Sequence, residues 1–413
     1  MRSKLKSPLF IIFVTIFFDL LGFGVIIPVL PSLFADPSSQ FFMLASGVSV
    51  QTGYILTGLL VGLFFLGQFF ASPILGELSD QHGRKKIIII SLIGTLAAQI
   101  LMGTSIAIKS VALLFVTRLI HGFVTAIIPV AQATIADITP PAERAKNFGL
   151  IGAAFGLGFI VGPFIGGILS DHTLSPYFGA STPFWFASIL AIINIIFVSR
   201  FFKETHLVRT KKPLELARGI KNIMRAYRMP TLRPLFLTSF FYNAGFTFYT
   251  TFAGIFLFDH FGFTSQSIGI YFAYVGVWIA ITQGFLIRRA TRRWNERTIL
   301  EKSILGTAIF VILQTLTGAP WELFLITPFF SISNGFTMSN LSGLLSRSAP
   351  KEAQGEIMGI ASSINAVASM IPPVLSGFVA AALSPSSPLI VAGLLCAIAW
   401  AIFVSTQTST KTS

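Results

Sequence analysis

Two charged side chains stand alone inside long apolar stretches, and their types suit proton transfer. Asp19 lies in the apolar run 8–34, and Arg118 lies in the apolar run 111–136. A charge among hydrocarbon side chains is costly unless it is paired, hydrated or neutralised by a proton. Asp19 is therefore a candidate for binding and releasing a proton, and Arg118 for tuning that exchange. The alternative for Asp19 is a structural role, as a hydrogen-bonding side chain at a bend in its helix.

Helix geometry sets the expected distance between these two side chains. At 1.5 Å per residue, Asp19 lies about 16 Å from the start of its run, and Arg118 lies about 28 Å from Asp137 at the end of its own. Both of these ends are expected at the inner face of the membrane, so the two side chains would be about 12 Å apart along the membrane normal. Arg118 could bind carbonyls near Gly22 and Gly24 or act on Asp19 through water, and we expect the two to be coupled.

Long apolar runs must position these residues, because such runs dominate the composition. Of the 413 residues, 54% are hydrophobic and 11% are charged, with a mean hydropathy of +0.80. In soluble domains about a quarter of the residues are charged. A helix of roughly 20 apolar residues is long enough to cross a bilayer. We therefore predict an all-α polytopic membrane protein with twelve transmembrane helices, near 8–34, 52–75, 87–108, 111–136, 146–170, 182–202, 235–258, 264–287, 298–317, 321–345, 356–382 and 386–406.

The positive charges are distributed unevenly along the chain. The formal net charge is +14, and nearly all of the 29 Lys and Arg fall at the termini, in even-numbered loops or at helix ends beside them. The exceptions are Lys109 and Arg118. Positive residues remain on the cytoplasmic side of a membrane, so both termini should be cytoplasmic. The charge thus reports topology, and we expect no nucleic acid partner.

The two halves of the chain share a pattern, since Gly76 and Arg84 recur as Gly284 and Arg292 at one common offset. Duplicated bundles with a site between them are common in secondary transporters. We predict an N-terminal six-helix bundle, a cytoplasmic linker and a C-terminal six-helix bundle, with the boundaries 1–202, 203–233 and 234–413.

The linker carries an amphipathic pattern. Apolar residues recur at helical spacing on one side and basic residues lie on the other: Leu216, Ile220, Ile223 and Tyr227, against Arg218, Lys221, Arg225 and Arg228. A basic amphipathic helix of this kind is typical of segments that lie on the anionic inner leaflet. The alternative is a solvated tether, and in either case we expect no substrate binding by the linker.

A short polar turn separates the second and third runs, and it reads Gly76-x-Leu78-x-Asp80-x-x-Gly83-Arg84-Lys85. A carboxylate is favourable where a helix begins, so we expect Asp80 to cap the helix that follows. We also expect Arg84 to contact Asp137, and Asp80 to face the eleventh helix near Gly355. Such a cluster would act as a cytoplasmic gate that holds this side closed and breaks when the halves move. The alternative is a helix cap combined with cationic anchors.

Small residues and aromatic residues mark two further regions. Gly158, Gly162 and Gly166 recur every four residues, with Pro163 and Gly167 among them, which favours close helix packing at a bend. The alternative is ordinary packing of small residues. Aromatic, Met and amide side chains suit amphipathic organic ligands. The predicted substrate pocket consists of Tyr242, Asn243, Phe246, Tyr249, Asn334, Met338 and Asn365.

Four motifs together resemble the major facilitator superfamily. The turn 76–85 resembles its signature between helices 2 and 3, and Arg118-x-x-x-Gly122 resembles the helix 4 motif of proton-coupled members. Gly158-x-x-x-Gly162-Pro163-x-x-Gly166-Gly167 resembles the helix 5 antiporter motif of drug exporters. The segment 19–31 looks like helix 1 of the tetracycline and multidrug branch. The resemblance implies a drug:proton antiporter that exports small amphipathic organic compounds by alternating access.

Some positions depart from this family pattern. Tetracycline exporters of the branch carry acids deep in helices 3 and 9 and a His in helix 8. Here the runs 87–108 and 298–317 have no acid deep inside, since Glu301 lies near the cytoplasmic end, and the run 264–287 has no His. The export of a metal–tetracycline complex is therefore not expected. Proton-coupled uptake of a small nutrient by a symporter is the alternative function. A non-transporting membrane sensor or assembly factor is a third.

Other features exclude further classes of protein. The lone Cys396 lies in the last apolar run, so neither a disulfide framework nor a cysteine metal site is expected. No G-x-x-x-x-G-K-[ST] sequence and no catalytic constellation occurs, so we expect no enzyme activity, cofactor or metal. The first run is too long for a cleavable signal peptide. We expect a monomeric multi-pass protein of a bacterial inner membrane, whose partners are its organic substrate, protons and lipid.

Overall fold

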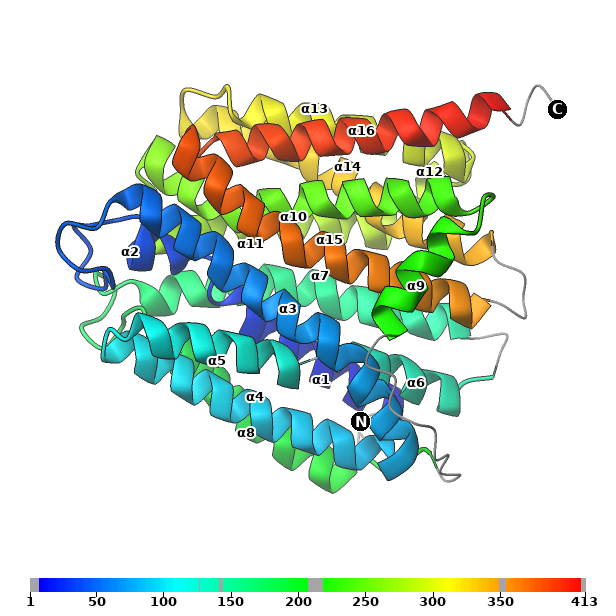
Figure 1. Ribbon diagram of the computed structural model, residues 1–413, viewed down its shortest axis with the longest axis horizontal. Helices are drawn as coiled ribbons and strands as arrows, with labels where there is room; N and C mark the ends of the chain where they lie inside the picture. The colour runs from blue at the N-terminus through cyan, green and yellow to red at the C-terminus, as the bar shows by residue number, and fades with distance from the viewer. Residues whose placement is uncertain (1–6, 126, 141–143, 207–217, 349–353, 410–413) are drawn as a thin grey trace. The chain divides into compact units, whose positions relative to one another are not determined.

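The computed structural model describes residues 7–125, 127–140, 144–206, 218–348 and 354–409 (Figure 1). Within these ranges the chain forms helices and turns and contains no strand. The helices are α1 Pro8–Gly24, α2 Leu30–Phe34, α3 Val50–His82, α4 Arg84–Ala107, α5 Val111–Val124, α6 Ile128–Ile138, α7 Arg144–Ser170, α8 Thr182–Phe201, α9 Arg218–Tyr227, α10 Arg233–Phe261, α11 Ser265–Ile281, α12 Ile287–Ala290, α13 Glu296–Gln314, α14 Pro320–Arg347, α15 Gln354–Ala382 and α16 Ser387–Ser409.

Two of the predicted helices are broken near proline. The run 8–34 is divided into α1 and α2 by a turn that contains Pro28, and the run 111–136 is divided into α5 and α6 just before Pro129. Proline lacks an amide hydrogen and clashes with the preceding turn, so it is accepted in a turn or in the first turn of a new helix. Each of these two predicted spans therefore consists of two helical segments. A π-helical turn, Thr282–Leu286, joins α11 to α12.

The helices group into two compact units by their internal contacts. The first unit lies within 1–48, 63–216 and 264–273. In it α1 packs along α7, and α4 packs along both α5 and α8 (Figure 1). Apolar residues of α1, α4, α6 and α8 form a buried core, including Ile11, Ile88, Val130 and Val198. This core fixes the helices that carry Asp19, Arg84 and Asp137.

The second unit lies within 49–62, 217–263 and 274–413. In it α10 packs between α15 and α16, and α13 packs against α14 and α16 (Figure 1). Its buried core includes Leu300, Ile304, Cys396 and Phe403. The first part of α3 belongs to this unit: a Cβ on Gly58 would lie 2.3 Å from the carbonyl oxygen of Pro373 in α15. Only glycine permits so close an approach.

Eight helical segments among the described residues are long and apolar enough to cross a bilayer by length and composition. They are 50–82, 84–107, 111–138, 150–170, 182–201, 265–290, 357–382 and 387–405. The other four predicted spans correspond to α1, α10, α13 and α14.

The linker helix α9 packs on α15. The Asn222 amide donates to the Ser363 hydroxyl at 3.1 Å, and Ala226 is buried at this contact. The opposite side exposes Ile220, Met224 and Tyr227. Ile223, which we grouped with Ile220 and Tyr227, is only half-exposed. Leu216 lies outside the described residues.

Candidate functional site

Asp19 lies in α1 one turn before Gly22, in the helix that packs along α7. The residue is partly accessible. Among the described residues its carboxylate makes no hydrogen bond and no ion pair. A structural role as a hydrogen-bonding side chain would require such a bond. The geometry thus leaves this carboxylate available to a proton or to water.

Arg118 lies in α5 and is fully enclosed, with 0% of its surface exposed. Its guanidinium carbon lies 4.5 Å from the ring centre of Phe64 and 5.3 Å from that of Phe23, which favours a cation. Its Nη1 lies 3.4 Å from Nδ1 of His121. Its Nε and Nη2 have no hydrogen-bond partner in the described part of the chain. A direct bond from Arg118 to the carbonyl of Gly22, which we considered, is therefore not found there.

A glutamine and a histidine connect Arg118 to α1 instead. Gln99 of α4 donates its amide to the carbonyl of Gly22 at 3.2 Å, and the same nitrogen lies 3.5 Å from Nε2 of His121. Both side chains are buried. Sequence reasoning missed both. The available signal was the spacing of His121, three residues after Arg118 on the same face of an otherwise apolar helix.

The glycines of α7 bring that helix directly against α1. A Cβ on Gly158 would lie 2.6 Å from Cβ of Leu20, and one on Gly166 would lie 2.4 Å from the carbonyl oxygen of Val25. A Cβ on Gly162 between them would lie 2.9 Å from the carbonyl oxygen of Leu21, and Pro163 lies within α7 at the same level. Larger side chains would separate the two helices, so the repeat sets the position of α1 immediately after Asp19.

Gly167 faces a different partner. A Cβ there would lie 2.5 Å from the carbonyl oxygen of Ser265 and 3.0 Å from Cα of Gly269, both at the start of α11. The five motif residues of α7 thus serve two separate contacts within the first unit.

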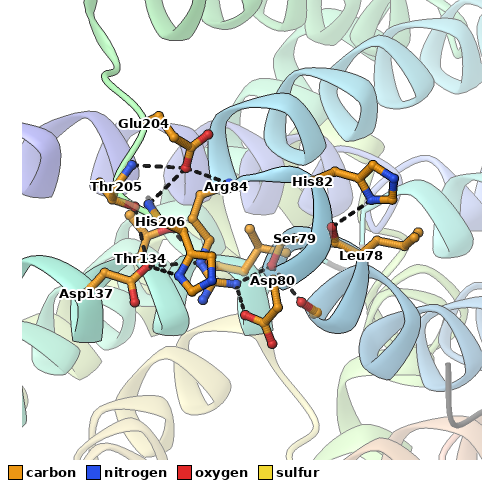
Figure 2. Close-up of polar contacts among 12 residues, drawn as sticks. Leu78, Ser79, Asp80, His82, Arg84, Thr134, Asp137, Glu204, Thr205 and His206 are labelled. Atoms are coloured by element: carbon orange, nitrogen blue, oxygen red, sulfur yellow. Dashed lines mark hydrogen bonds and ion pairs between the residues drawn. The ribbon is translucent and has the colours of Figure 1, made fainter. Parts of the chain in front are cut away.

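A second polar group, which we call the charge cluster, forms where α3 and α6 end and α4 begins (Figure 2). Its members are Asp80, Arg84, Asp137, Glu204 and His206. Arg84 is 4% exposed, its Nη1 lies 2.6 Å from Oδ1 of Asp80, and its Nε donates to Oδ2 of Asp137 at 3.0 Å. The contact between Arg84 and Asp137 that we expected is present. The expected contact of Asp80 with the eleventh helix stays a prediction.

Glu204 performs the capping role that we assigned to Asp80. Helix α3 continues past Asp80, which therefore lies in its last turn. The Glu204 carboxylate accepts the backbone N–H groups of Arg84 at 2.8 Å and Lys85 at 3.1 Å (Figure 2). These donors lie in the first turn of α4, where N–H groups lack partners within the helix. Our assignment of the cap to Asp80 was wrong.

Gly83 makes this cap possible. Its φ is +98°, a region that residues with a Cβ avoid, and a Cβ there would lie 2.5 Å from Oε2 of Glu204. Gly76 differs, because a Cβ there would meet only Cβ of Pro129 at 3.7 Å, an ordinary contact. The structure gives no steric reason for glycine at position 76.

The residues after Glu204 fold back over Asp137. Thr205 donates its hydroxyl to Oδ2 of Asp137 at 3.5 Å, and Nδ1 of His206 lies 3.7 Å from the same oxygen (Figure 2). The backbone N–H groups of Thr205 and His206 both donate to Oε1 of Glu204 at 3.0 Å. Burial acts to raise the pKa of Glu204, but these backbone donors, with those of Arg84 and Lys85, outweigh it and hold that pKa below its usual value.

The predicted pocket residues of the second unit divide into two groups. Tyr242, Tyr249 and Asn334 are enclosed between helices, where the Tyr242 hydroxyl donates to the Asn334 amide and Tyr249 packs 4.6 Å from the ring of Phe330. These three hold α10 to α14. Their side chains have almost no accessible surface, so we withdraw them from the pocket prediction.

The other pocket residues are partly accessible. The Asn243 amide donates to Oδ1 of Asn365 at 3.2 Å, which joins α10 to α15, and the Ser239 hydroxyl donates to the same oxygen at 3.0 Å. Phe246 and Met338 are also partly accessible. These four, Asn243, Phe246, Met338 and Asn365, are the pocket candidates that remain.

Comparison with known proteins identifies the class. The chain combines apolar helices, a charged turn at 76–85 and the glycine-packed helix α7. The sequence profile of the Major Facilitator Superfamily matches residues 12–371 and 235–412. The chain belongs to this family. It is therefore a multi-pass integral membrane protein of a family of transporters, not of enzymes.

Its relatives are named for drug resistance. The chain is 30% identical to the class H tetracycline resistance protein of Pasteurella multocida, over 91% of this chain and 89% of that one. It is 29% identical to the class C tetracycline resistance protein of Escherichia coli, over 90% and 89%. It is 28% identical to multidrug resistance protein 2 of Bacillus subtilis (strain 168), over 91% and 89%.

Solved structures share the fold. A bacterial homolog of the human lysosomal transporter Spinster matches with a TM-score of 0.76 and 15% identity, over 98% of this chain and 97% of that one. A D-xylose–proton symporter matches with a TM-score of 0.75 and 14% identity, over 97% of each chain. The prediction of twelve membrane-spanning helices in two six-helix bundles is confirmed at the level of the fold.

Proposed function

We propose that this protein is a proton-coupled antiporter that exports small amphipathic organic compounds by alternating access. The observation that carries the proposal is Asp19, a carboxylate in a membrane-spanning helix with no partner among the described residues. An ionisable group at such a position is a functional candidate, because its charge is costly there. The tetracycline and multidrug resistance names of its relatives support export.

Asp19 couples the proton to movement through the cost of its charge. The charged carboxylate favours a state of the protein in which water reaches it, and the protonated carboxyl can be enclosed. A proton that binds from one side of the membrane and is released to the other therefore shifts the equilibrium between these two states of the transporter. In this proposal Arg118, in the same unit, supplies a fixed positive charge that tunes the protonation of Asp19.

The charge cluster is the proposed cytoplasmic gate. Arg84 is held between Asp80 and Asp137, and Glu204 fixes the end of α4 from which Arg84 projects. A cluster at the ends of three helices can be made in one state and broken in the other, which is how such switches operate. Gly76, despite its place in the motif, adds no close packing to this gate.

The pocket candidates set the proposed substrate class. Phe246 and Met338 offer apolar, adaptable surface, and the amides of Asn243 and Asn365 offer neutral hydrogen bonds. Such a lining suits an amphipathic molecule without a strong positive charge. The absence of deep acids from the runs 87–108 and 298–317 supports the same class.

The proposal includes an orientation and a setting. The distribution of Lys and Arg supports cytoplasmic termini. The bacterial sources of the relatives support a bacterial inner membrane, and the proposal takes the protein as a monomer in lipid. The exposed apolar residues of α9, with the basic residues beside them, support a helix that lies on the anionic inner leaflet. The linker 203–233 then joins the bundles 1–202 and 234–413 and takes no part in substrate binding.

The test uses the full chain in liposomes with an imposed pH gradient and a panel of dyes, drugs and metabolites. Inward proton flow should drive substrate outward, and Asp19→Asn should abolish uphill transport. Asp259→Asn, an exposed acid at the end of α10, is the matched control and should transport normally. Substrate that moves together with protons would establish the symport alternative. Normal uphill transport by Asp19→Asn would refute the proton site.

A further inference from the structure

A chain of buried polar groups runs from α5 through α4 to α1. Nη1 of Arg118 lies 3.4 Å from Nδ1 of His121, Nε2 of His121 lies 3.5 Å from the Gln99 amide nitrogen, and that nitrogen donates to the Gly22 carbonyl at 3.2 Å. Arg118, His121 and Gln99 are each at most 1% exposed. The chain ends one turn from Asp19.

The donors and acceptors in this row of polar groups do not match, so not every group can have a hydrogen-bond partner at the same time. Arginine only donates, so Nδ1 of His121 must accept from Arg118 and the ring proton must be on Nε2. That proton then faces the Gln99 amide nitrogen, which is also a donor. The Gln99 oxygen meanwhile has no partner among the described residues.

Rotation of the Gln99 amide by half a turn gives the other arrangement. Its oxygen would then accept from Nε2 of His121, and the carbonyl of Gly22 would lose its donor. Each arrangement leaves two buried groups without a partner: the Nε2–H of His121 and the Gln99 oxygen in the first, and the Gly22 carbonyl and the Gln99 NH2 in the second. An unpaired buried group costs about 1–3 kcal/mol, so neither arrangement is strongly preferred. The amide can therefore respond to small changes at either end.

We propose that His121 and Gln99 are positioning residues that hold Arg118 in place and connect its position to α1 beside Asp19. This rests on the proposed function, since it concerns the coupling of Arg118 to the proton site. The acceptor nitrogen of His121 is the one hydrogen-bond partner that holds the guanidinium among the described residues, because the aromatic rings of Phe23 and Phe64 fix its plane but not its direction. Gln99 transmits that position to the backbone of α1.

Three aspects of the packing support a connection of this kind. Gly22 admits the Gln99 amide, because a Cβ there would lie 2.8 Å from its nitrogen. On its other side α1 packs closely against the glycines of α7, so α1 can move only a short distance away from Gln99. The groups that face His121 are Arg118 from α5, Gln99 from α4 and the Phe64 ring of α3, and no carboxylate is among these contacts.

The experiment measures the protonation of Asp19 directly. Infrared difference spectra of the purified full chain, taken between pH 4 and 10, should contain a carboxyl band that is absent in Asp19→Asn. We expect His121→Leu and Gln99→Leu to move the midpoint of this band in the same direction, by about one pH unit, which is a tenfold change in proton affinity. Gly22→Ala, which displaces the amide, should give the same shift. His121→Gln keeps an acceptor and should retain the wild-type midpoint.

Each other outcome has a definite meaning. Gln314→Leu removes a buried amide from α13 in the second unit and should leave the midpoint unchanged. If the three disruptive variants unfold more easily but keep the midpoint, the residues are only structural and the inference fails. If His121→Gln shifts the midpoint as His121→Leu does, the titration of His121 itself is responsible, which also overturns it. If the band persists in Asp19→Asn, the proposed proton site fails instead.

Discussion

The charge cluster and the interior residues Asp19 and Arg118 are of the same residue types, but their charges differ in how far they are paired. In the cluster, Arg84 contacts two carboxylates, and the third, Glu204, accepts four backbone N–H groups. In the interior, Asp19 has no polar partner among the described residues, and Arg118 has two nitrogens without one. The difference separates charges that hold helices together from charges that remain free to respond.

This difference follows from where the charges lie. The cluster lies at helix ends, where backbone N–H groups and the linker supply partners without breaking a helix. The interior charges lie in the middle of helices whose own backbone groups are already paired, so only side chains from neighbouring helices can reach them. Breaking the cluster should therefore cost stability, and neutralising Asp19 should not.

Unpairing the cluster should have the largest effect. Arg84→Met leaves the carboxylates of Asp80 and Asp137 without their cation. Because these carboxylates are 41% and 21% exposed, water compensates part of the loss, and we expect a cost of about 2–3 kcal/mol, between that of an exposed pair and that of a fully buried one. We expect the free energy of unfolding in detergent to fall by that amount, as measured by denaturant titration. The matched control is Arg347→Met, which breaks the more exposed pair with Glu296 and should cost less than about 1 kcal/mol.

The double variant Arg84→Met/Asp137→Leu sharpens the test. Replacing both partners of a buried pair by apolar groups is often nearly neutral, so it should recover part of the lost stability. Equal losses for Arg84→Met and Arg347→Met would show that the cluster is no more stabilising than an exposed pair.

The packing beside Asp19 should have the next largest effect. In Gly166→Ala the new methyl would lie 2.4 Å from the carbonyl oxygen of Val25, so α1 must move, and overpacking of this kind costs about 1–3 kcal/mol. Transport should fall as well, because α1 carries the proton site. Gly152→Ala on the same helix has no atom within 4 Å and is the control. Equal unfolding midpoints for the two variants would show that α7 does not position α1.

The cap on α4 should contribute less, and its contribution should depend on pH. Glu204→Gln should lower the free energy of unfolding by about 1 kcal/mol at neutral pH, since a charged acceptor is lost from a helix start. Because the folded-state pKa of Glu204 lies below its usual value, the wild-type advantage is complete above the usual value and is lost as the pH falls through the folded-state value. The two proteins should become equally stable in acid. Glu301→Gln, the same change outside the cluster, is the control.

The sequence was sufficient for features that depend on composition and on local spacing. The apolar runs predicted the membrane helices, and the contact between Arg84 and Asp137 followed from two charges at helix ends on one side of the membrane. Helix breaks at Pro28 and Pro129 could have been predicted from the same rules, since proline in a long apolar run ends or bends a helix.

The remaining contacts join segments that are distant in the sequence. Glu204 caps a helix 120 residues earlier, and Gln99 bonds a carbonyl 77 residues earlier. No periodicity or motif within either segment specifies the partner, because the contact exists only after the helices have packed. The enclosed position of Tyr242 and Asn334 is similar: the residue types suit a ligand pocket and a helix contact equally well, and only packing decides between them.

Neutralising Asp19 should have the smallest effect on stability and is the sharpest test of the comparison. The Asp19 carboxylate makes no hydrogen bond or ion pair in the described part of the chain, so Asp19→Asn removes no native interaction. We expect the free energy of unfolding to change by less than about 0.5 kcal/mol, as for substitutions that break no contact. The same variant should lose uphill transport completely. A loss of stability comparable to that of Arg84→Met would mean that Asp19 is paired in the membrane. The charge cluster and the interior residues would then differ in where they lie but not in how their charges are paired.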